Sequence, residues 1–315
     1  MEGCSLKISK NKKVLFIVLG AILSLVLGVF AFGYFQLNRI KEVEITTDNG
    51  SLGIRDSYEQ EIEEKYNKKP KNVTNILFLG IDKEENASDS IMIVSIDEDD
   101  KKLKMTSIMR DSYIDFEGQS VKKINYAYHY GGPQFTIKTI NENYDMNIKD
   151  YVKVSFEGLT NIIDAMGGVQ ISIKDYELPA MKNYGISKAG TYNLTGKQAL
   201  GYSRIRKVGN NDYERTERQR VVLTALFNKV KSKGISAYAS VMPKILSNVE
   251  TSVNKTELIG LGNKIVSMGV SNIEQFRLPL DNYKKDAYEN GLFYLKWDKQ
   301  PNVDALHKFI YGEDK

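Results

Sequence analysis

Four arginines in the segment YSRIRKVGNNDYERTERQR have a spacing that could bind an anion. They are Arg204, Arg206, Arg215 and Arg218. Arg204 and Arg206 are two residues apart, so their side chains would point to one side of an extended segment. Arg215 and Arg218 have the three-residue spacing of neighbours on one helical face. Arginine in the first turn of a helix is disfavoured by the helix dipole, and a bound phosphate would remove that penalty. The cluster therefore indicates a phosphate site.

The charges around the second arginine pair allow another interpretation. Asn211 and Asp212 precede the pair and are typical of a helix N-cap. Glu214 and Glu217 alternate with the arginines and could pair with them on a solvated helix face. The spacing alone favours neither interpretation, so the choice depends on the rest of the chain.

Two carboxylates and another arginine lie at the ends of neighbouring predicted strands. Asp82 follows the first strand in FLGID, Asp89 precedes the second in ASDS, and Arg110 follows the third in SIMRDSY. Ligands of open α/β sheets collect at such strand ends, and Mg²⁺ typically binds one or two carboxylates plus substrate phosphates. Each residue also has a simpler explanation, because Asp is common in turns and Arg110 could pair with Asp111.

Several other chemistries lack the residues that they need. The chain has two histidines, His129 and His307, and one cysteine, Cys4. A Ser-His-Asp triad or a zinc site with several imidazoles therefore has few candidate residues. Neither a GxxxxGK[ST] phosphate loop nor a GxGxxG motif occurs.

Strands and helices alternate along most of the chain. Short apolar or β-branched runs predict strands at 75–80, 90–96, 102–108, 151–155, 169–173 and 273–278. Helices are predicted at 58–66, 122–129, 132–143, 156–166, 195–202 and 212–233. This order predicts an α/β fold, an α/β/α sandwich with a central mixed sheet.

The N-terminal part predicts a membrane anchor. Residues 14–35 carry no charge and are long enough to span a bilayer, for which about 20 apolar residues suffice. Lysines concentrate before this segment, which predicts a cytoplasmic tail at 1–13. We therefore expect an extracellular stalk at 36–71 and an extracellular catalytic domain at 72–315, in the cell membrane. A cleaved signal peptide is the alternative to an uncleaved transmembrane helix.

The net charge gives little support to nucleic-acid binding. The whole chain has a formal net charge of +4. Four lysines and Glu2 in residues 1–13 account for +3 of it, so the remainder is nearly neutral. The predicted domain therefore has no large net positive charge to attract nucleic acid, and its basic groups matter through where they lie.

Seven ordered motifs resemble the LytR-CpsA-Psr family. They are NILFLGID, SDSIMIVSID, MTSIMRDSY, INYAYHYGGP, VSFEGLTNIIDAMGGV, LTGKQALGYSRIRK and DYERTERQR. They extend from about residue 75 to residue 233. The chain departs from the family pattern at Ala87, where arginine is frequent, and at Met109, where proline is common.

The resemblance implies an extracytoplasmic phosphotransferase. Such an enzyme takes an anionic glycopolymer, of the teichoic acid or capsular polysaccharide type, from a polyprenyl pyrophosphate carrier and attaches it to peptidoglycan. The matching motifs imply that Asp82 and Asp89 bind Mg²⁺. They also imply that the pyrophosphate is held by Arg110, Arg204, Arg206, Arg215 and Arg218. A hydrophobic tunnel between the sheet and its helices would take the lipid.

Three other functions remain as alternatives. A scaffold could bind the lipid-linked glycan without turnover, and a pyrophosphatase could use water as the acceptor at the same site. A transcriptional regulator would need the domain to meet DNA, which the predicted topology and the near-neutral domain oppose. Asp89 or Asp212 could accept the proton of an acceptor hydroxyl, and the sequence does not choose between them.

Overall fold

The structure is a computed structural model that describes residues 38–206, 211–233, 237 and 240–313. The predicted tail at 1–13 and the predicted span at 14–35 lie outside the described residues. Within the described part of the chain, no helix has both the length and the apolar composition to cross a bilayer.

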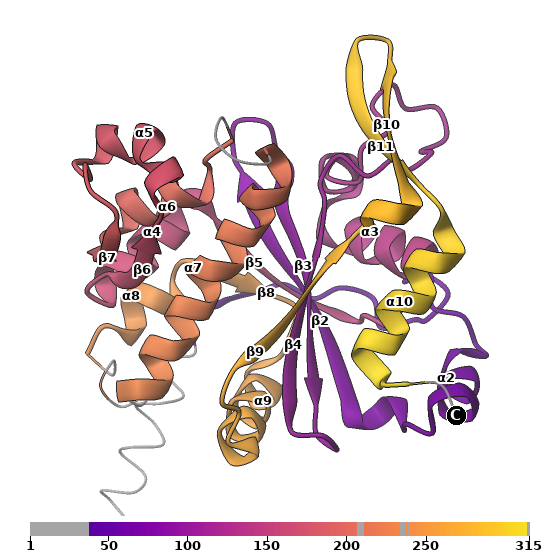
Figure 1. Cartoon of the computed structure of the whole chain (residues 1–315). Coiled ribbons are helices and arrows are strands. Elements are labelled where there is room, and N and C mark those ends of the chain that lie inside the picture. Colours follow the sequence, from indigo (N-terminus) through magenta and orange to yellow (C-terminus); the bar gives the residue numbers. More distant parts are fainter. Residues whose placement is uncertain (1–37, 207–210, 234–236, 238–239, 314–315) are drawn as a thin grey trace, which may run out of the picture.

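A mixed β-sheet runs through the centre of the domain (Figure 1). In the described residues its order is β1 (Lys41–Glu42), β8 (Val249–Thr251), β5 (Asp150–Ser155), β2 (Val73–Asp82), β3 (Ala87–Asp97), β4 (Lys102–Ile108) and β9 (Ile273–Leu278). Strand β2 pairs antiparallel with β3 and parallel with β5, and β4 pairs parallel with β9. The predicted α/β class with a central mixed sheet is confirmed.

Helices cover both faces of this sheet (Figure 1). One face carries α2 (Tyr58–Tyr66), α3 (Tyr126–Tyr144) and α10 (Lys299–Tyr311); the other carries α4 (Phe156–Ala165), α6 (Gly196–Ser203), α7 (Asn211–Lys233) and α9 (Lys255–Met268). Alternation along β2 accounts for the two layers, because successive side chains of a strand point to opposite faces. Leu77 and Leu79 pack with the first group of helices, whereas Ile76 and Phe78 pack with the second.

Smaller elements lie around the sandwich. Hairpins are formed by β6 (Val169–Ile173) with β7 (Gly190–Leu194) and by β10 (Lys284–Glu289) with β11 (Leu292–Trp297). Two short helices are α5 (Leu178–Met181) and α8 (Met242–Leu246). The β10–β11 hairpin projects from the end of β9 and returns the chain to α10 (Figure 1).

The predicted helices at 122–129 and 132–143 form one element with a break. Helix α3 begins at Tyr126, so residues 122–125 are not helical as expected. The backbone leaves helical geometry at Gly131 and Gly132, which is where the two predicted helices were separated. The break redirects the chain, and the second half of α3 packs on the sheet.

The segment expected to be a stalk, at 36–71, is part of the domain in its described portion. Helix α2 lies where a short helix was predicted, but Tyr58, Ile62 and Tyr66 are buried in the main core together with Leu52. A free stalk would expose these apolar side chains to water, and burying each one contributes about 1.5–3 kcal/mol. The stalk interpretation of residues 38–71 is therefore wrong.

A buried ion pair network fixes the same segment to the sheet. Asp97, at the end of β3, is fully buried and lies 3.0 Å from the Nζ of Lys68 and 3.3 Å from the Nζ of Lys104. The Nζ of Lys104 also donates to the backbone carbonyl of Ile310 at 2.6 Å. One carboxylate thus joins the segment before β2, the sheet and α10.

We expect Gly196→Ala to destabilise the protein by about 1–3 kcal/mol, because the added methyl group overpacks a close contact. A Cβ at Gly196 would lie 2.2 Å from the carbonyl oxygen of Thr160 where α6 meets α4. Gly260, inside α9, has open space around it, so Gly260→Ala should instead stabilise by about 0.5–1 kcal/mol through helix propensity. Urea unfolding of the purified full chain measures both effects. Equal effects of the two substitutions would contradict this account.

Candidate functional site

The two aspartates lie at one end of the β2–β3 hairpin. Asp82 is the last residue of β2. The pairing register passes from Gly80 opposite Ser90 to Ile81 opposite Ser88, so Asp89 is the extra residue of a β-bulge. A bulge re-aims a side chain relative to the regular pleat. Sequence reasoning placed Asp89 before β3, whereas it lies within that strand.

Three arginines converge on these aspartates. The Nη1 of Arg110, just beyond β4, forms a short ion pair with Asp89. The Nη2 of Arg206 lies 3.7 Å from the Oδ2 of Asp89, and the Nη2 of Arg204 lies 3.5 Å from the Oδ2 of Asp82. Sequence reasoning expected the two aspartates and Arg110 to face one cleft, and the structure brings all five side chains together.

The arginines lie outside the carboxylates. The side chains of Arg204 and Arg206 are 50% and 44% exposed, whereas those of Asp82 and Asp89 are 13% and 6% exposed. An incoming ligand would therefore meet guanidinium groups first. Such groups bind phosphate through planar, paired hydrogen bonds.

The two aspartates can supply part of a Mg²⁺ coordination shell. The described residues contain no group of three or more His, Cys, Asp or Glu side chains placed to hold a metal. Two carboxylates fit Mg²⁺ when phosphate and water oxygens provide the remaining ligands. Asp89 already contacts two arginines, so a metal there would require Arg110 or Arg206 to turn toward the phosphate.

The second arginine pair is placed differently from the first. Arg215 and Arg218 are each 2% exposed in the early turns of α7. The Nε of Arg218 donates to Glu177 at 2.7 Å, its Nη2 donates to Glu214 at 2.6 Å, and its Nη1 donates to the backbone carbonyl of Ile205 at 3.2 Å. The pair with Glu214 is the one that the solvated-face interpretation proposed, except that Arg218 is buried.

An apolar cavity opens beside the charged cluster. Its volume is about 150 Å³. It lies between β2, β3 and β5 on one side and α4, α6 and α7 on the other. Its lining includes Phe78, Met92, Val154, Phe156, Leu159, Ile162, Val222, Leu223 and Leu226. The guanidinium of Arg204 lies 4.9 Å from the centre of the Phe156 ring, so an apolar wall adjoins the cationic group.

Comparison with known proteins assigns this arrangement to a family. The LytR_cpsA_psr family model matches residues 43–308. The chain belongs to the LytR-CpsA-Psr family. A polyisoprenyl-teichoic acid–peptidoglycan teichoic acid transferase TagU of Bacillus mycoides (strain KBAB4) is 31% identical, with 95% of this chain and 97% of that protein covered. The regulatory protein MsrR of Staphylococcus aureus (strain COL) is 33% identical over 75% of this chain and 73% of MsrR.

Solved structures of other LytR-CpsA-Psr proteins share the fold. A structure of TagT bound to LI-WTA superposes with a TM-score of 0.64 and 28% identity, covering 76% of this chain and 90% of TagT. The family protein YwtF (TagT) with bound octaprenyl pyrophosphate lipid gives a TM-score of 0.60 and 26% identity, covering 76% and 89% of the two chains.

Sequence reasoning on this LytR-CpsA-Psr chain missed Glu177. This residue is 1% exposed and binds Arg218, although the two are 41 positions apart in the chain. A single glutamate in a short turn carries no signal that it will be buried beside a helix. The family motif marked Arg218, but its carboxylate partner lies outside that motif. The side chain of Asp212, a candidate base, lies outside the described residues.

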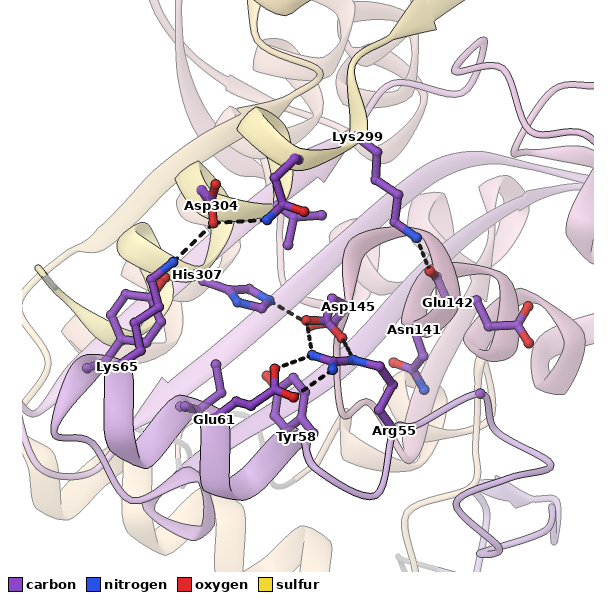
Figure 2. Close-up of a pocket in the computed structure, with 15 residues that line it drawn as sticks. Arg55, Tyr58, Glu61, Lys65, Asn141, Glu142, Asp145, Lys299, Asp304 and His307 are labelled. Carbon is purple, nitrogen blue, oxygen red and sulfur yellow. Dashed lines mark hydrogen bonds and ion pairs between the residues drawn. The ribbon is translucent and has the colours of Figure 1, made fainter.

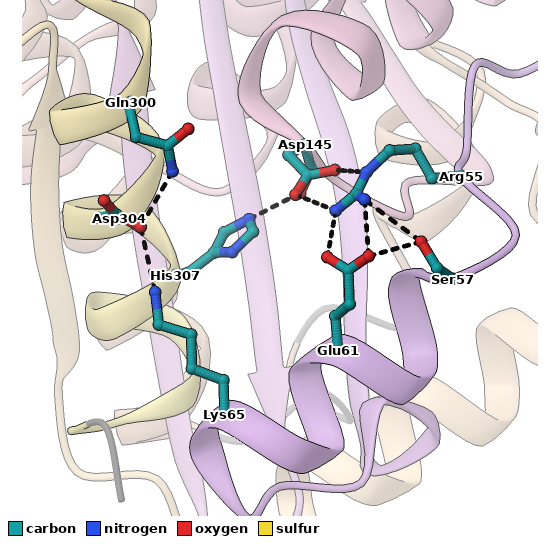
Figure 3. Close-up of polar contacts among 8 residues, drawn as sticks. All are labelled: Arg55, Ser57, Glu61, Lys65, Asp145, Gln300, Asp304 and His307. Carbon is teal, nitrogen blue, oxygen red and sulfur yellow. Dashed lines mark hydrogen bonds and ion pairs between the residues drawn. The ribbon is translucent and has the colours of Figure 1, made fainter.

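A larger cavity of about 510 Å³ lies on the opposite face of the sheet, between α2, the end of α3 and α10 (Figure 2). Several of its charges pair with one another (Figure 3). Arg55 donates to Asp145 at 2.6 Å and to Glu61 at 2.7 Å, and Lys65 reaches Asp304 at 3.1 Å. The mixed, mutually neutralised charges make this cavity a poor fit for a lipid pyrophosphate.

The Arg218–Glu177 pair should contribute to folding. We expect Arg218→Met to lower the free energy of unfolding by about 3–5 kcal/mol, because it leaves the Glu177 carboxylate buried without its cation. The double variant Arg218→Met/Glu177→Leu should recover much of this loss, and Arg204→Met, at an exposed arginine, should change stability little. Urea unfolding of the full chain measures all three. If Arg218→Met were as stable as the wild type, the pair would have no role in stabilising the fold.

His307 should make stability depend on pH. Its Nε2 donates to the carbonyl oxygen of Asp145 at 2.6 Å, and burial lowers the pKa of the imidazole. The unfolded chain, with an ordinary histidine pKa of about 6.5, then binds a proton that the folded chain does not. Stability should therefore fall as the pH drops from 7.5 to 5.5, by at most about 1.4 kcal/mol per pH unit.

Urea unfolding at both pH values measures this effect. His307→Gln should reduce the pH dependence, whereas His129→Gln, at the exposed histidine, should retain it. A wild-type stability that stays constant over this interval would contradict the argument.

Proposed function

We propose that this chain transfers an anionic glycopolymer from a polyprenyl pyrophosphate carrier to peptidoglycan. The observation that carries the proposal is the meeting of exposed arginines with an apolar cavity, through Arg204 and Phe156. A lipid pyrophosphate has the same two parts, an apolar chain and an anionic group. The teichoic acid transferase TagU and the lipid-bound TagT structure support this assignment.

The cavity must widen to hold a polyprenyl chain. A volume of about 150 Å³ accommodates a group of roughly the size of benzene. Leu159 and Ile162 of α4 and Leu223 and Leu226 of α7 all line it. Separation of these two helices would extend the cavity while keeping an apolar lining, and the lipid would then replace the contacts that the helices lose.

The site residues would act mainly by positioning and charge. Arg204, Arg206 and Arg110 would neutralise the pyrophosphate oxygens, and Asp82 and Asp89 would hold Mg²⁺ beside them. When bound, Mg²⁺ would supply further neutralisation of the phosphate charge. We expected Arg215 and Arg218, which belong to α7, to contact the pyrophosphate directly. Of these two, Arg218 has contacts that indicate a positioning role.

The reaction breaks a phosphoanhydride bond and forms a phosphate ester bond. An acceptor hydroxyl oxygen bonds to the phosphorus that carries the glycopolymer, and the bond from that phosphorus to the bridging oxygen breaks. Polyprenyl phosphate leaves with the bond electrons, and a base such as Asp89 or Asp212 accepts the hydroxyl proton. The product is a phosphodiester between glycopolymer and peptidoglycan.

The N-terminal sequence supports an extracellular location for the reaction. An anchor at residues 14–35 with a cytoplasmic N-terminus would place the domain at the outer surface of the cell membrane, where peptidoglycan lies. A reporter fused after Lys315 tests this orientation. A cytoplasmic C-terminus would argue against the transferase.

We expect purified full-length protein with Mg²⁺ to move the phosphoglycosyl part of a polyprenyl pyrophosphate substrate to peptidoglycan fragments. Arg206→Ala should lower the rate by about 100-fold or more, because it removes charge stabilisation at the phosphate. Lys264→Ala, on α9 and paired with Glu98, should keep the wild-type rate. Chelation should stop the reaction, and added Mg²⁺ should restore it.

Three outcomes of this assay would oppose parts of the proposal. Substrate consumption without transfer would assign a pyrophosphatase instead. Binding without consumption would assign a scaffold. Arg206→Ala at the wild-type rate would remove that arginine from the site.

A further inference from the structure

A second group of cations surrounds Tyr213 on the β9 side of α7. The guanidinium carbon of Arg277 lies 4.6 Å from the centre of the Tyr213 ring, and the Nζ of Lys284 lies 4.5 Å from it. Arg277 is near the end of β9 and Lys284 begins β10, so both come from the strand that faces α7 and from the hairpin after it. Two cations against one ring repel each other, and a nearby anion would relieve that repulsion.

A third cation, Arg220, lies further along the same face of α7. It is 8% exposed, and its Nε donates to Gln275 of β9 at 3.0 Å. Burial lowers the pKa of Arg220 to about 10, and the charge of Arg277 adds to this lowering while Glu217 opposes it. The two cations therefore act on each other across the α7–β9 contact.

Several polar atoms in this contact have no hydrogen-bond partner within the described part of the chain. They are the Nη1 of Arg220, the hydroxyl of Tyr213 and the hydroxyl of Ser107, all buried. Ser107 of β4 lies opposite Arg277 in the strand pairing. An unsatisfied buried polar group costs about 1–3 kcal/mol, and a ligand that reached these groups would remove that cost.

The acidic residues near this cluster bind its cations weakly. Asp281 lies 2.8 Å from the Nη2 of Arg277 and 3.8 Å from the Nζ of Lys284, and its side chain is 67% exposed. Asp286 lies 3.7 Å from Lys284 and is 59% exposed. Ion pairs with such exposed partners contribute about 0–1 kcal/mol, so a phosphate can displace them.

The cluster adjoins the arginine site but lies away from the lipid cavity. The Nη1 of Arg277 contacts the sulfur of Met109, the residue before Arg110, at 3.3 Å. Along α7, Val222 and Leu226 line the apolar cavity, whereas Tyr213 and Arg220 contact β9 or the residues after it. A substrate with its lipid on one side of α7 and its pyrophosphate at Arg204 and Arg206 would continue toward the second cluster.

We infer that Arg277 and Lys284, supported by Tyr213 and Arg220, form a subsite for a phosphate group of the glycopolymer beyond the pyrophosphate. This inference rests on the proposed function for its choice of ligand. Its chemistry is arginine and lysine binding to a phosphodiester, and it would select polymers with phosphate in their repeating units over neutral polymers.

The test compares two lipid pyrophosphate donors with the same first sugars. One continues into a poly(glycerol phosphate) chain, and the other ends as a neutral saccharide. Full-length Arg277→Gln and Lys284→Gln should each lower kcat/KM about tenfold for the phosphate-bearing donor and less than twofold for the neutral donor. Lys102→Gln, which removes one charge at the far end of β4, should leave both values unchanged.

A second measurement does not need turnover. Soluble poly(glycerol phosphate) without lipid or pyrophosphate should bind the wild-type protein, and Arg277→Gln should weaken this binding severalfold while Lys102→Gln does not. If the polymer binds in this way but no donor is transferred, the subsite stands and the proposed transferase function fails.

Other results would overturn the subsite. An equal fall in kcat/KM for both donors would show that Arg277 and Lys284 act on a part that the two donors share. A rise in KM for the peptidoglycan fragment with no change for the polymer would assign the cluster to the acceptor. If every variant bound the soluble polymer as tightly as the wild type, the inference would also be refuted.

Discussion

The crowding of arginines at one end of the sheet depends on buried carboxylates. Arg110 and Arg206 share Asp89, Arg204 pairs with Asp82, and Arg218 binds Glu177. Like charges held this close would repel one another without these partners, and each carboxylate comes from an element other than that of its arginine. The carboxylates lie inward and the guanidinium groups of Arg204 and Arg206 lie outward, so the carboxylates offset the positive charge while the two guanidinium groups stay exposed to solvent.

Helix α7 contributes residues to each part of the proposed site. Its first turns carry Arg215 and Arg218, one face lines the apolar cavity, and another face contacts β9. A movement of α7 would therefore change the cavity and the arginine site together. Because the cavity is too small for a polyprenyl chain as it stands, lipid entry and charge placement would be coupled through this one helix.

Sequence patterns predicted the local structure well where a pattern repeats. The strands at 102–108, 169–173 and 273–278 and the helix at 58–66 occur with the predicted bounds, because β-branched runs and helical periodicity are local properties. The packing of α2 was not predicted. Polar, charged surroundings suggested a stalk, whereas Tyr58 and Ile62 face a core that also contains residues far away in the chain, such as Ile140 of α3 and Leu306 of α10.

The sequence by itself determined the family, many of the elements and the residue types of the candidate site, because these follow from periodicity and from ordered motifs. Only the tertiary structure decided which charges meet. Arg204 and Arg206 reach aspartates 122 and 117 positions earlier in the chain, and Arg218 reaches a glutamate 41 positions earlier. Spacing along a chain gives the direction of neighbouring side chains, but pairings over such separations depend on strand order, on the bulge at Asp89 and on helix packing. Those features exist once the sheet and its two helical layers have formed.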